Sequence, residues 1–189
     1  LICMYVRNSS SGLIFTISSF IVFLFAMFTV RFYGMNVKAY TDPLTGLNNR
    51  SRWDEMMNGE EKPGESYGIM MMDLNHLKST NDVMGHEFGD KMIRSFAWIL
   101  RESVPREFNV CRWGGDEFAV IVWGADEKLI MNTIKAINEN VEKYNCLDGN
   151  PEISYAVGYA LSTEFPELSK KKMFEKADER MYSNKKLWY

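Results

Sequence analysis

The chain has 189 residues, of which 46% are hydrophobic, so it is long enough for one domain of roughly 150 residues and an additional segment. Its formal net charge of −3 excludes a general electrostatic attraction to nucleic acid, so any phosphate must be bound by a few placed groups. The cysteines (Cys3, Cys111 and Cys146) are odd in number and lack ligand spacing, which favours reduced thiols over a disulfide framework. Leu1 in place of an initial methionine indicates a fragment or a processed product.

Residues 8–30 contain no charged side chain, and residues 13–30 form a run of apolar side chains with a few serines and threonines. At a helical rise of about 1.5 Å per residue, the inner run would be roughly 27 Å long, close to the hydrocarbon thickness of a bilayer. The run is apolar on all sides, as expected of a helix surrounded by lipid. We therefore predict a transmembrane helix over residues 8–30. A signal peptide or a buried core helix would also be apolar, but no small-residue cleavage site follows the run.

Basic residues flank this segment unequally, with one before it (Arg7) and several after it (Arg31, Lys38, Arg50 and Arg52). The positive-inside rule places the C-terminal side in the cytoplasm and predicts a single-pass protein of the inner, cytoplasmic membrane. Residues 31–39 are expected to form a short, partly helical connector with a weak point at Gly34. An Asp-Pro turn follows, and we expect a globular domain over residues 40–189.

Residues 67–74 form an apolar run with one carboxylate, Asp73, near its end. The length of the run and its flanks favour a buried central strand. An ionised carboxylate at the end of such a strand is costly unless a cation or hydrogen bonds meet it. Asp73 is therefore the first candidate for a functional residue.

Two further strands are predicted at residues 108–112 and 118–123, which are rich in valine, isoleucine and aromatic residues. Gly114 and Gly115 lie between them, and paired glycines are favoured in a two-residue hairpin whose central residues both need positive φ. We therefore expect a tight hairpin with both glycines at its tip. Their missing side chains would let a bulky anion approach the backbone.

Two carboxylates, Asp116 and Glu117, follow the glycines directly. They could hold a divalent cation against an anion bound at the hairpin tip. An ordinary polar hairpin tip would show the same local pattern.

Elsewhere, amphipathic helices are predicted over residues 88–104 and 125–145, and a strand over residues 153–161. A final helix is predicted over residues 168–188.

Several motifs resemble the GGDEF-domain family, whose members are diguanylate cyclases that join two GTP molecules into cyclic di-GMP. The hairpin spells the family's signature, Arg112-Trp113-Gly114-Gly115-Asp116-Glu117-Phe118. Residues 42–50 resemble the Asp-x-Leu-Thr-Gly-Leu-x-Asn-Arg segment with which these domains start. Further matches follow the central strand and lie in the final helix (Asp73, Lys78, Asn81, Asp82, Gly85, His86, Gly89, Asp90 and residues 177–185). Asn75 and Leu77 depart from the family's usual Asp and Phe, at positions that are not main metal ligands.

The resemblance implies a nucleotidyl-cyclase-like α/β (α+β) fold, in which a mixed central β-sheet is flanked by helices and preceded here by one transmembrane helix. It implies that Mg²⁺ or Mn²⁺ binds to Asp73, to the backbone carbonyl of Leu74, to Asp116 and to Glu117. Two such ions would neutralise charge on the transferred phosphate and lower the pKa of the attacking ribose hydroxyl. Glu117 would bind the second ion or assist deprotonation. The arrangement requires the ends of two strands to meet, which spacing alone does not establish.

The same resemblance assigns Lys78 and Lys185 to the terminal phosphates of GTP, with Lys78 also counted among the catalytic residues. Without it, Lys185 would be interpreted as a solvated surface lysine. Asn81 and Asp90 correspond to the residues that bind guanine. An ionised Asp90 can accept hydrogen bonds from the N1–H and N2 amine of guanine, whereas adenine offers no such pair of donors, so GTP is favoured over ATP.

Two departures from the family pattern have functional consequences. Pro105 and Phe108 occupy the end positions of the family's product-inhibition motif, Arg-x-x-Asp, so that site is expected to be absent. Tyr189 stands where the family often has an arginine, so one phosphate clamp is expected to be missing.

Because one domain presents one GTP half-site, the active form is expected to be a two-fold homodimer. The alternatives are a catalytically weak or inactive GGDEF domain that binds GTP or a partner, and a different nucleotide cyclase on the same fold.

Overall fold

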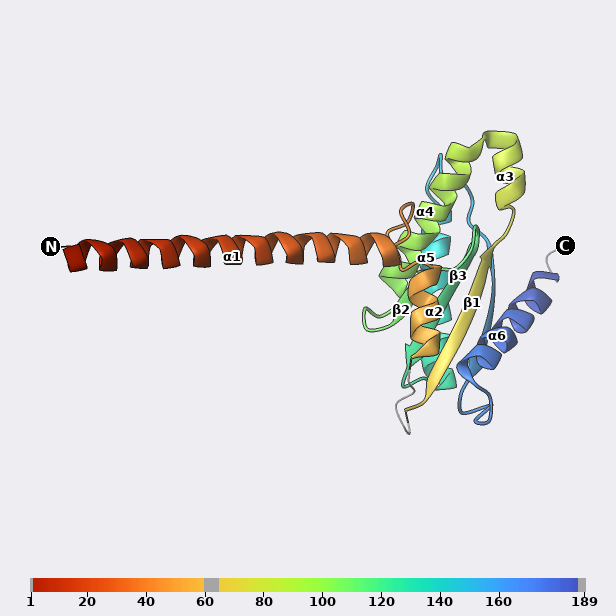
Figure 1. The fold of residues 1–189 in the computed structure, drawn as a ribbon. Coiled ribbons are helices and arrows are strands. Elements are labelled where there is room, and N and C mark those ends of the chain that lie inside the picture. The colour runs from red at the N-terminus through yellow and green to blue at the C-terminus, as the bar shows by residue number, and fades with distance from the viewer. Residues whose placement is uncertain (1, 60–64, 187–189) are drawn as a thin grey trace. The chain divides into compact units, whose positions relative to one another are not determined.

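The computed structural model of the protein describes residues 2–59 and 65–186 and divides the chain into two units, Leu1–Ala39 and Tyr40–Tyr189. The described part of the first unit belongs to one helix, α1 (Ile2–Tyr40), which ends at the first residue of the second unit and is drawn in red and orange in Figure 1. Its Ile14–Phe32 stretch has a mean hydropathy of 2.0 and none of it is buried, so this helix is long and apolar enough to cross a membrane. The stretch overlaps the span predicted from the sequence.

The helix α1 continues without a break through residues 31–39, where the sequence predicted only a partly helical connector. Gly34 therefore does not interrupt the helix. A single glycine costs a helix only about 1 kcal/mol relative to alanine, which is too little to break one of 39 residues.

The second unit is built around a four-stranded sheet with the order β2-β3-β1-β4. Its strands are β1 (Tyr67–Leu74), β2 (Asn109–Arg112), β3 (Glu117–Trp123) and β4 (Tyr155–Leu161). These strands pair antiparallel, and an isolated parallel bridge joins Asn48 to Cys111 beside β2. All eight residues of β1 are buried, which explains why its sequence is a continuous apolar run. The α/β fold with a helix-flanked central sheet is confirmed.

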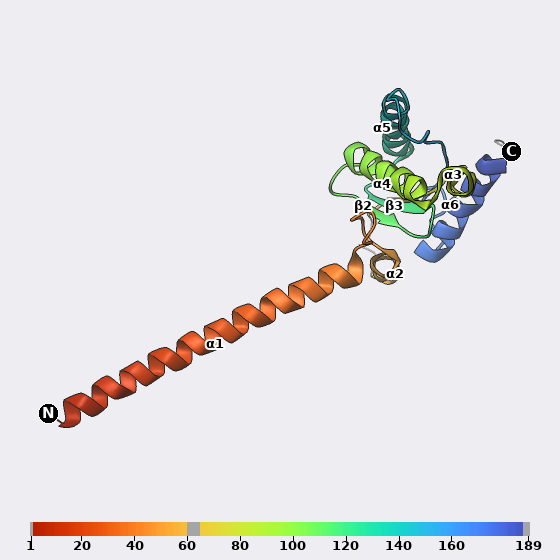
Figure 2. The ribbon, with the colours of Figure 1, turned by 90° about the horizontal axis from the view of Figure 1, so that it is seen from above.

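Helices cover both faces of the sheet, as Figures 1 and 2 show. Alternate residues of β1, such as Met70 and Met72, pack with α4 (His86–Ser103) and α5 (Glu127–Asn145). The intervening residues, such as Ile69 and Met71, pack with α2 (Arg50–Asn58) and α6 (Lys170–Lys185). The short helix α3 (Leu77–Met84) connects β1 to α4. Asp73 belongs to the second set, so its side chain is on the α6 face of the sheet.

Helix α6 lies unusually close to strand β4. A Cβ atom on Gly158 would lie only 2.1 Å from the backbone nitrogen of Met181 and 2.3 Å from the carbonyl oxygen of Ala177. Gly158 therefore allows direct contact between the backbones of β4 and α6. Met173, Ala177 and Met181, spaced four residues apart, form the buried stripe of the helix.

The hairpin between β2 and β3 differs from the predicted two-residue turn. The backbone nitrogen of Trp113 donates to the carbonyl of Glu117 at 2.9 Å, which leaves Gly114, Gly115 and Asp116 in the loop. Neither glycine has positive φ, so that part of the prediction was wrong. A Cβ on Gly114 would lie 2.4 Å from Oε2 of Glu117, whereas one on Gly115 would meet nothing within 4 Å. A side chain at position 114 would therefore displace the carboxylate of Glu117, whereas neither glycine supplies a left-handed backbone.

Candidate active site

The acidic residues selected from the sequence meet at one end of the sheet. Asp73 of β1 lies directly opposite Glu117 of β3 in the antiparallel register. The backbone nitrogen of Leu74 donates to the carbonyl of Asp116 at 3.0 Å. Directly opposed residues in an antiparallel pair direct their side chains to the same face of the sheet. Asp73 and Glu117 therefore share the face that α6 covers, and the hairpin tip borders them.

Burial and neighbouring carboxylates perturb both acids in the same direction. Burial raises the pKa of Asp73, and the charges of Asp116 and Asp178 raise it further, although Lys185 opposes the effect. Burial also raises the pKa of Glu117, and the charges of Asp116, Asp73 and Asp178 raise it further, with Lys185 again opposing the effect. Repulsion between neighbouring carboxylates disfavours their ionised forms, and a cation bound between them stabilises those ionised forms.

Lys185 supplies one positive charge to this cluster. It lies one turn beyond Met181 on the same side of α6, and its Nζ is 2.5 Å from Oδ1 of Asp73. The side chains are 23% and 10% exposed, respectively, so the pair is largely shielded from water. Lys185 is thus not an ordinary solvated lysine, because α6 directs it at the end of β1.

Two adjacent cavities share Lys185 as a wall. The first has a volume of about 460 Å³ and is lined by both strand acids and the C-terminal half of α6 (Asp73, Glu117, Asp178, Met181, Tyr182, Lys185 and Lys186). The second, of about 360 Å³, is lined by the end of β1, the start of α3 and the hairpin (Leu74, His76, Leu77, Lys78, Ser79, Asp82, Asp116 and Lys185). The two cavities together contain the candidate metal ligands and both candidate phosphate-binding lysines.

The donor set fits a hard divalent cation. Asp73 and Glu117 provide carboxylate oxygens, and Lys185 already places a positive charge on Asp73. Within residues 2–59 and 65–186, no group of three or more His, Cys, Asp or Glu side chains is close enough to enclose a metal ion. Mg²⁺ commonly binds through one or two carboxylates and completes its shell with water and substrate phosphates. An open site with few ligands already in contact distance suits an ion that arrives with a phosphorylated substrate.

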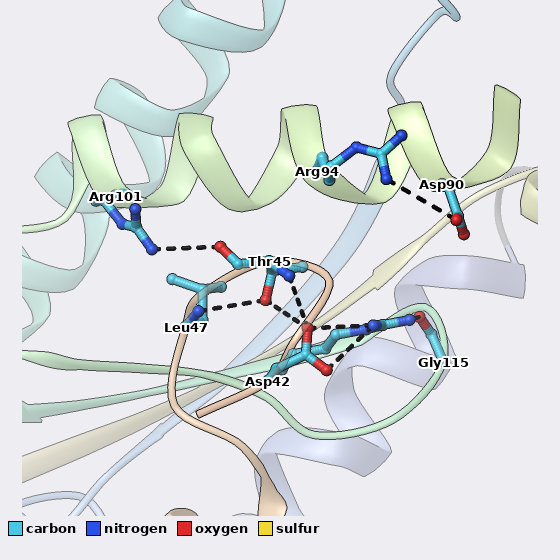
Figure 3. Close-up of polar contacts among 8 residues, drawn as sticks. Asp42, Thr45, Leu47, Asp90, Arg94, Arg101 and Gly115 are labelled. Carbon is cyan, nitrogen blue, oxygen red and sulfur yellow. Dashed lines mark hydrogen bonds and ion pairs between the residues drawn. The ribbon is translucent and has the colours of Figure 1, made fainter. Parts of the chain in front are cut away.

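The two candidate guanine-binding residues lie at the α3–α4 corner. Oδ1 of Asn81 is buried and has no hydrogen-bond partner among the residues described, and a Cβ on Gly89 would lie 2.0 Å from it. Asp90 follows Gly89 in α4 and is 3.8 Å from Arg94, as Figure 3 shows. The structure therefore brings Asn81 beside the turn of α4 that carries Asp90. Neither residue lines the two cavities described above.

An ion pair that the sequence did not indicate holds the hairpin tip. Arg112 donates to the carbonyl oxygen of Gly115 at 3.2 and 2.8 Å and to both carboxylate oxygens of Asp42 at 3.2 Å. Asp42 also accepts hydrogen bonds from the backbone nitrogen and hydroxyl of Thr45, at 2.9 and 2.7 Å. Although burial acts to raise the pKa of Asp42, the hydrogen bonds from Thr45 and the charge of Arg112 lower it. The first turn of the domain thereby fixes the loop that carries the acids.

Sequence reasoning also missed Asp178, which lines the first cavity. The available signal was its position two helical turns before Lys185, which places both residues on one side of α6.

Of the two predicted departures from the family pattern, the first concerns Pro105 and Phe108, which line a separate cavity beside the C-terminal end of α4. Tyr189 lies outside the described residues.

Comparison with known proteins gives the family of this chain. The sequence profile described as "Diguanylate cyclase, GGDEF domain" matches residues 39–187. The "Probable diguanylate cyclase DgcI" of Escherichia coli is 32% identical over 157 residues, which cover 82% of this chain and 33% of that protein. The "Uncharacterized membrane protein SSP1970" of Staphylococcus saprophyticus is 29% identical over 153 residues, covering 76% of this chain and 42% of the relative. The chain thus spans less than half the length of these relatives.

Solved structures share the fold as well. The coiled coil and GGDEF domain of DgcB from Caulobacter crescentus, determined in complex with c-di-GMP, is similar with a TM-score of 0.77 and 26% identity. The match covers 85% of this chain and 88% of that one. The profile match includes nearly the whole second unit, and the structure brings the residues of the family signature together. This chain therefore belongs to the GGDEF-domain family, the family of the diguanylate cyclases.

Proposed function

We propose that this protein is a diguanylate cyclase that condenses two GTP molecules into cyclic di-GMP and two pyrophosphates. The observation that carries the proposal is the convergence of Asp73, Glu117 and Lys185 on one side of the sheet, next to a cavity containing Lys78 and Asp116. Phosphoryl transfer requires positioned phosphates and neutralised charge more than covalent chemistry. Carboxylates for a metal ion and lysines for phosphates supply both requirements.

In this proposal Asp73, the carbonyl of Leu74, Asp116 and Glu117 hold Mg²⁺ or Mn²⁺, which when bound polarises the phosphate and acidifies the ribose hydroxyl. Glu117 would accept the proton of that hydroxyl, since burial and neighbouring acids raise its pKa and make it a stronger base. Lys78 and Lys185 bind the terminal phosphates as point charges. The space created by Gly114 next to Glu117, and the open surface at Gly115, admit the triphosphate.

Asn81 and Asp90 are proposed to bind guanine. The buried, unpartnered Oδ1 of Asn81 (among the residues described) is an acceptor that would gain a partner from the base. Arg94 lies 3.8 Å from Asp90, one turn further along α4, and the two carboxylate oxygens of Asp90 can each accept a hydrogen bond from guanine. These features favour GTP over ATP as the substrate.

The membrane location and the assembly complete the proposal. Helix α1 would anchor the protein in the inner membrane as a single span with the GGDEF domain in the cytoplasm, consistent with relatives named as membrane proteins. Each domain presents one half-site, so two copies must face each other around a two-fold axis. With Pro105 and Phe108 in the positions of the product-inhibition motif, cyclic di-GMP is not expected to inhibit through that site.

The test is to incubate the full chain, reconstituted in proteoliposomes, with GTP and Mg²⁺ and to detect cyclic di-GMP by mass spectrometry. Wild-type protein should form the product from GTP and none of the corresponding product from ATP. Asp73→Asn should reduce synthesis at least about a hundredfold, because it removes a metal ligand needed for the transition state. Asp148→Asn, which changes an exposed carboxylate away from the site, is the matched control.

Failure of wild-type protein to form product, with its dimeric state verified by cross-linking, would contradict the cyclase proposal. Binding of GTP without turnover would then identify the chain as an inactive GGDEF module that acts through nucleotide or partner binding. Turnover of ATP instead of GTP would contradict the assigned specificity of Asp90 and leave a cyclase of a different kind.

A further inference from the structure

Lys185 has an anionic partner within the protein, and that partner is a carboxylate proposed to bind metal. The Nζ of Lys185 lies 2.5 Å from Oδ1 of Asp73, with side-chain exposures of 23% and 10%. A surface pair on the same helix, Lys172 with Glu175, is 62% and 43% exposed. Because the Lys185–Asp73 pair is largely shielded from water, its attraction is screened less than that of the surface pair.

A divalent ion and this ammonium compete for the same carboxylate. Mg²⁺ binds carboxylate oxygens at about 2.0–2.1 Å, so an ion on Asp73 would lie within a few ångströms of the Nζ of Lys185. The two positive charges would repel each other strongly inside a partly desolvated cavity. Full occupancy of the metal position therefore requires the ammonium to move away from Asp73.

A second position for the ammonium exists next to the first. Lys185 also lines the cavity that contains Lys78 and Asp116, where the triphosphate is proposed to bind. The flexible four-carbon stem of a lysine lets its ammonium change partners while the helix stays in place. Movement of the Lys185 side chain between the two cavities needs no displacement of α6, which the close contact at Gly158 holds against β4.

We propose that Lys185 is an internal counter-cation that occupies Asp73 in the nucleotide-free protein, and that the triphosphate draws the ammonium away so that the divalent ion can bind. The inference rests on the proposed function, because it assumes that Asp73 is a metal ligand. It adds an order of binding to the proposed function. The divalent ion binds weakly to the nucleotide-free protein and tightly once the triphosphate is bound. The site thereby avoids capturing a free divalent ion in an unproductive position.

The experiment is a titration of the nucleotide-free full chain with Mn²⁺, followed by electron paramagnetic resonance of the unbound ion. Lys185→Met should raise the affinity for Mn²⁺ by about tenfold, a typical size for energetic coupling between two sites. Lys186→Met is the matched control, because Lys186 lines the same cavity but its Nζ lies over the ring of Tyr182, at 4.6 Å. Its affinity should stay within about twofold of wild type, since an exposed lysine is well screened.

Two further variants separate charge from shape and from folding. Lys185→Gln keeps a hydrogen-bond donor without the charge and should show the same gain, whereas Lys185→Arg keeps the charge and should bind Mn²⁺ as weakly as wild type. The gain should disappear in the Asp73→Asn background, as a double-mutant cycle requires. Circular dichroism of each variant verifies that it is folded.

Equal or weaker Mn²⁺ binding by folded Lys185→Met and Lys185→Gln would overturn the inference. If wild type nevertheless binds Mn²⁺ through Asp73 in the presence of GTP, the proposed metal site survives and only the counter-cation role is lost. If no variant binds Mn²⁺ through Asp73 with or without GTP, both the inference and the proposed metal site are wrong.

Discussion

At the scale of single residues, the candidate site holds several carboxylates close enough to repel one another. Glu117 is partly buried and faces the charges of Asp116, Asp73 and Asp178, and burial together with these charges raises its pKa. A group whose pKa is raised in the folded state stabilises the fold below its unfolded pKa, and this contribution is lost as pH rises through the folded value. Ionised Glu117 therefore destabilises the metal-free protein at neutral pH.

Glu117→Gln is expected to stabilise the metal-free protein while abolishing cyclase activity. Relief of repulsion between partly solvated carboxylates is worth about 0.5–1 kcal/mol, or roughly 1–4 °C in Tm. Thermal unfolding in EDTA at pH 8 should reveal the gain, and the gain should vanish below pH 4.5, where the carboxyl is protonated in both states. Glu167→Gln, at an exposed position, should leave Tm unchanged. A lower Tm at pH 8 would mean that hydrogen bonds to Glu117 outweigh the repulsion.

At the scale of elements, the hairpin that carries the acids is fixed by the first turn of the domain. The Asp42–Arg112 pair is only about one-sixth exposed on each side chain (16% and 15%), and Arg112 also holds the carbonyl of Gly115. Asp42→Asn leaves a shielded guanidinium without its counter-charge. We expect a loss of about 1–3 kcal/mol in the free energy of unfolding.

Urea unfolding at two pH values tests this link. The pKa of Asp42 is lowered in the folded state, so its contribution is present above the unfolded value of 3.8 and is lost as pH falls through the folded value. The difference between wild type and Asp42→Asn should therefore be full at pH 7 and shrink below pH 3.8. Glu55→Gln, which breaks the exposed pair with Arg52, should cost at most about 0.5 kcal/mol. Equal costs for both variants would refute a special role for the Asp42–Arg112 pair.

The contact between α6 and β4 is the second element-level constraint. A methyl group on Gly158 would collide with backbone atoms of Met181 and Ala177, which cannot rotate away as a side chain can. Gly158→Ala should destabilise the domain by roughly 2–3 kcal/mol and shift Lys185 away from Asp73. The control is Gly115→Ala, whose added Cβ meets nothing within 4 Å. An unchanged Tm for Gly158→Ala would show that the helix can retreat without cost.

These contacts explain what the sequence could and could not predict. The alternation and apolar runs located the strands, and β1 was predicted to the residue, because burial on both faces leaves an unmistakable run. The pairing of Asp73 with Glu117 depends on register, since a shift of one residue would turn either side chain to the other face. The Lys185–Asp73 contact joins residues 112 apart through helix packing at Gly158, and no local pattern encodes it.

At the scale of the whole molecule, the proposed chemistry demands two copies. One domain offers one set of acids and lysines, whereas cyclic di-GMP contains two phosphodiester bonds made from two nucleotides. In the proposed membrane location, helix α1 would restrict the protein to the plane of the bilayer, where copies meet at a high effective concentration. Product formation should therefore depend on how the copies are paired, and not only on how many active domains are present.

Mixing active and inactive copies tests this requirement. Proteoliposomes with one part wild type and nine parts Asp73→Asn should leave only about a tenth of the wild-type molecules in wholly active dimers, so synthesis per wild-type molecule should fall about tenfold. The control is the same wild-type density diluted with lipid alone. Unchanged synthesis per wild-type molecule would mean that each copy completes the reaction by itself. A fall in cyclic product accompanied by a linear dinucleotide would instead show that a mixed dimer forms one bond and cannot form the second, because only one of its half-sites retains Asp73.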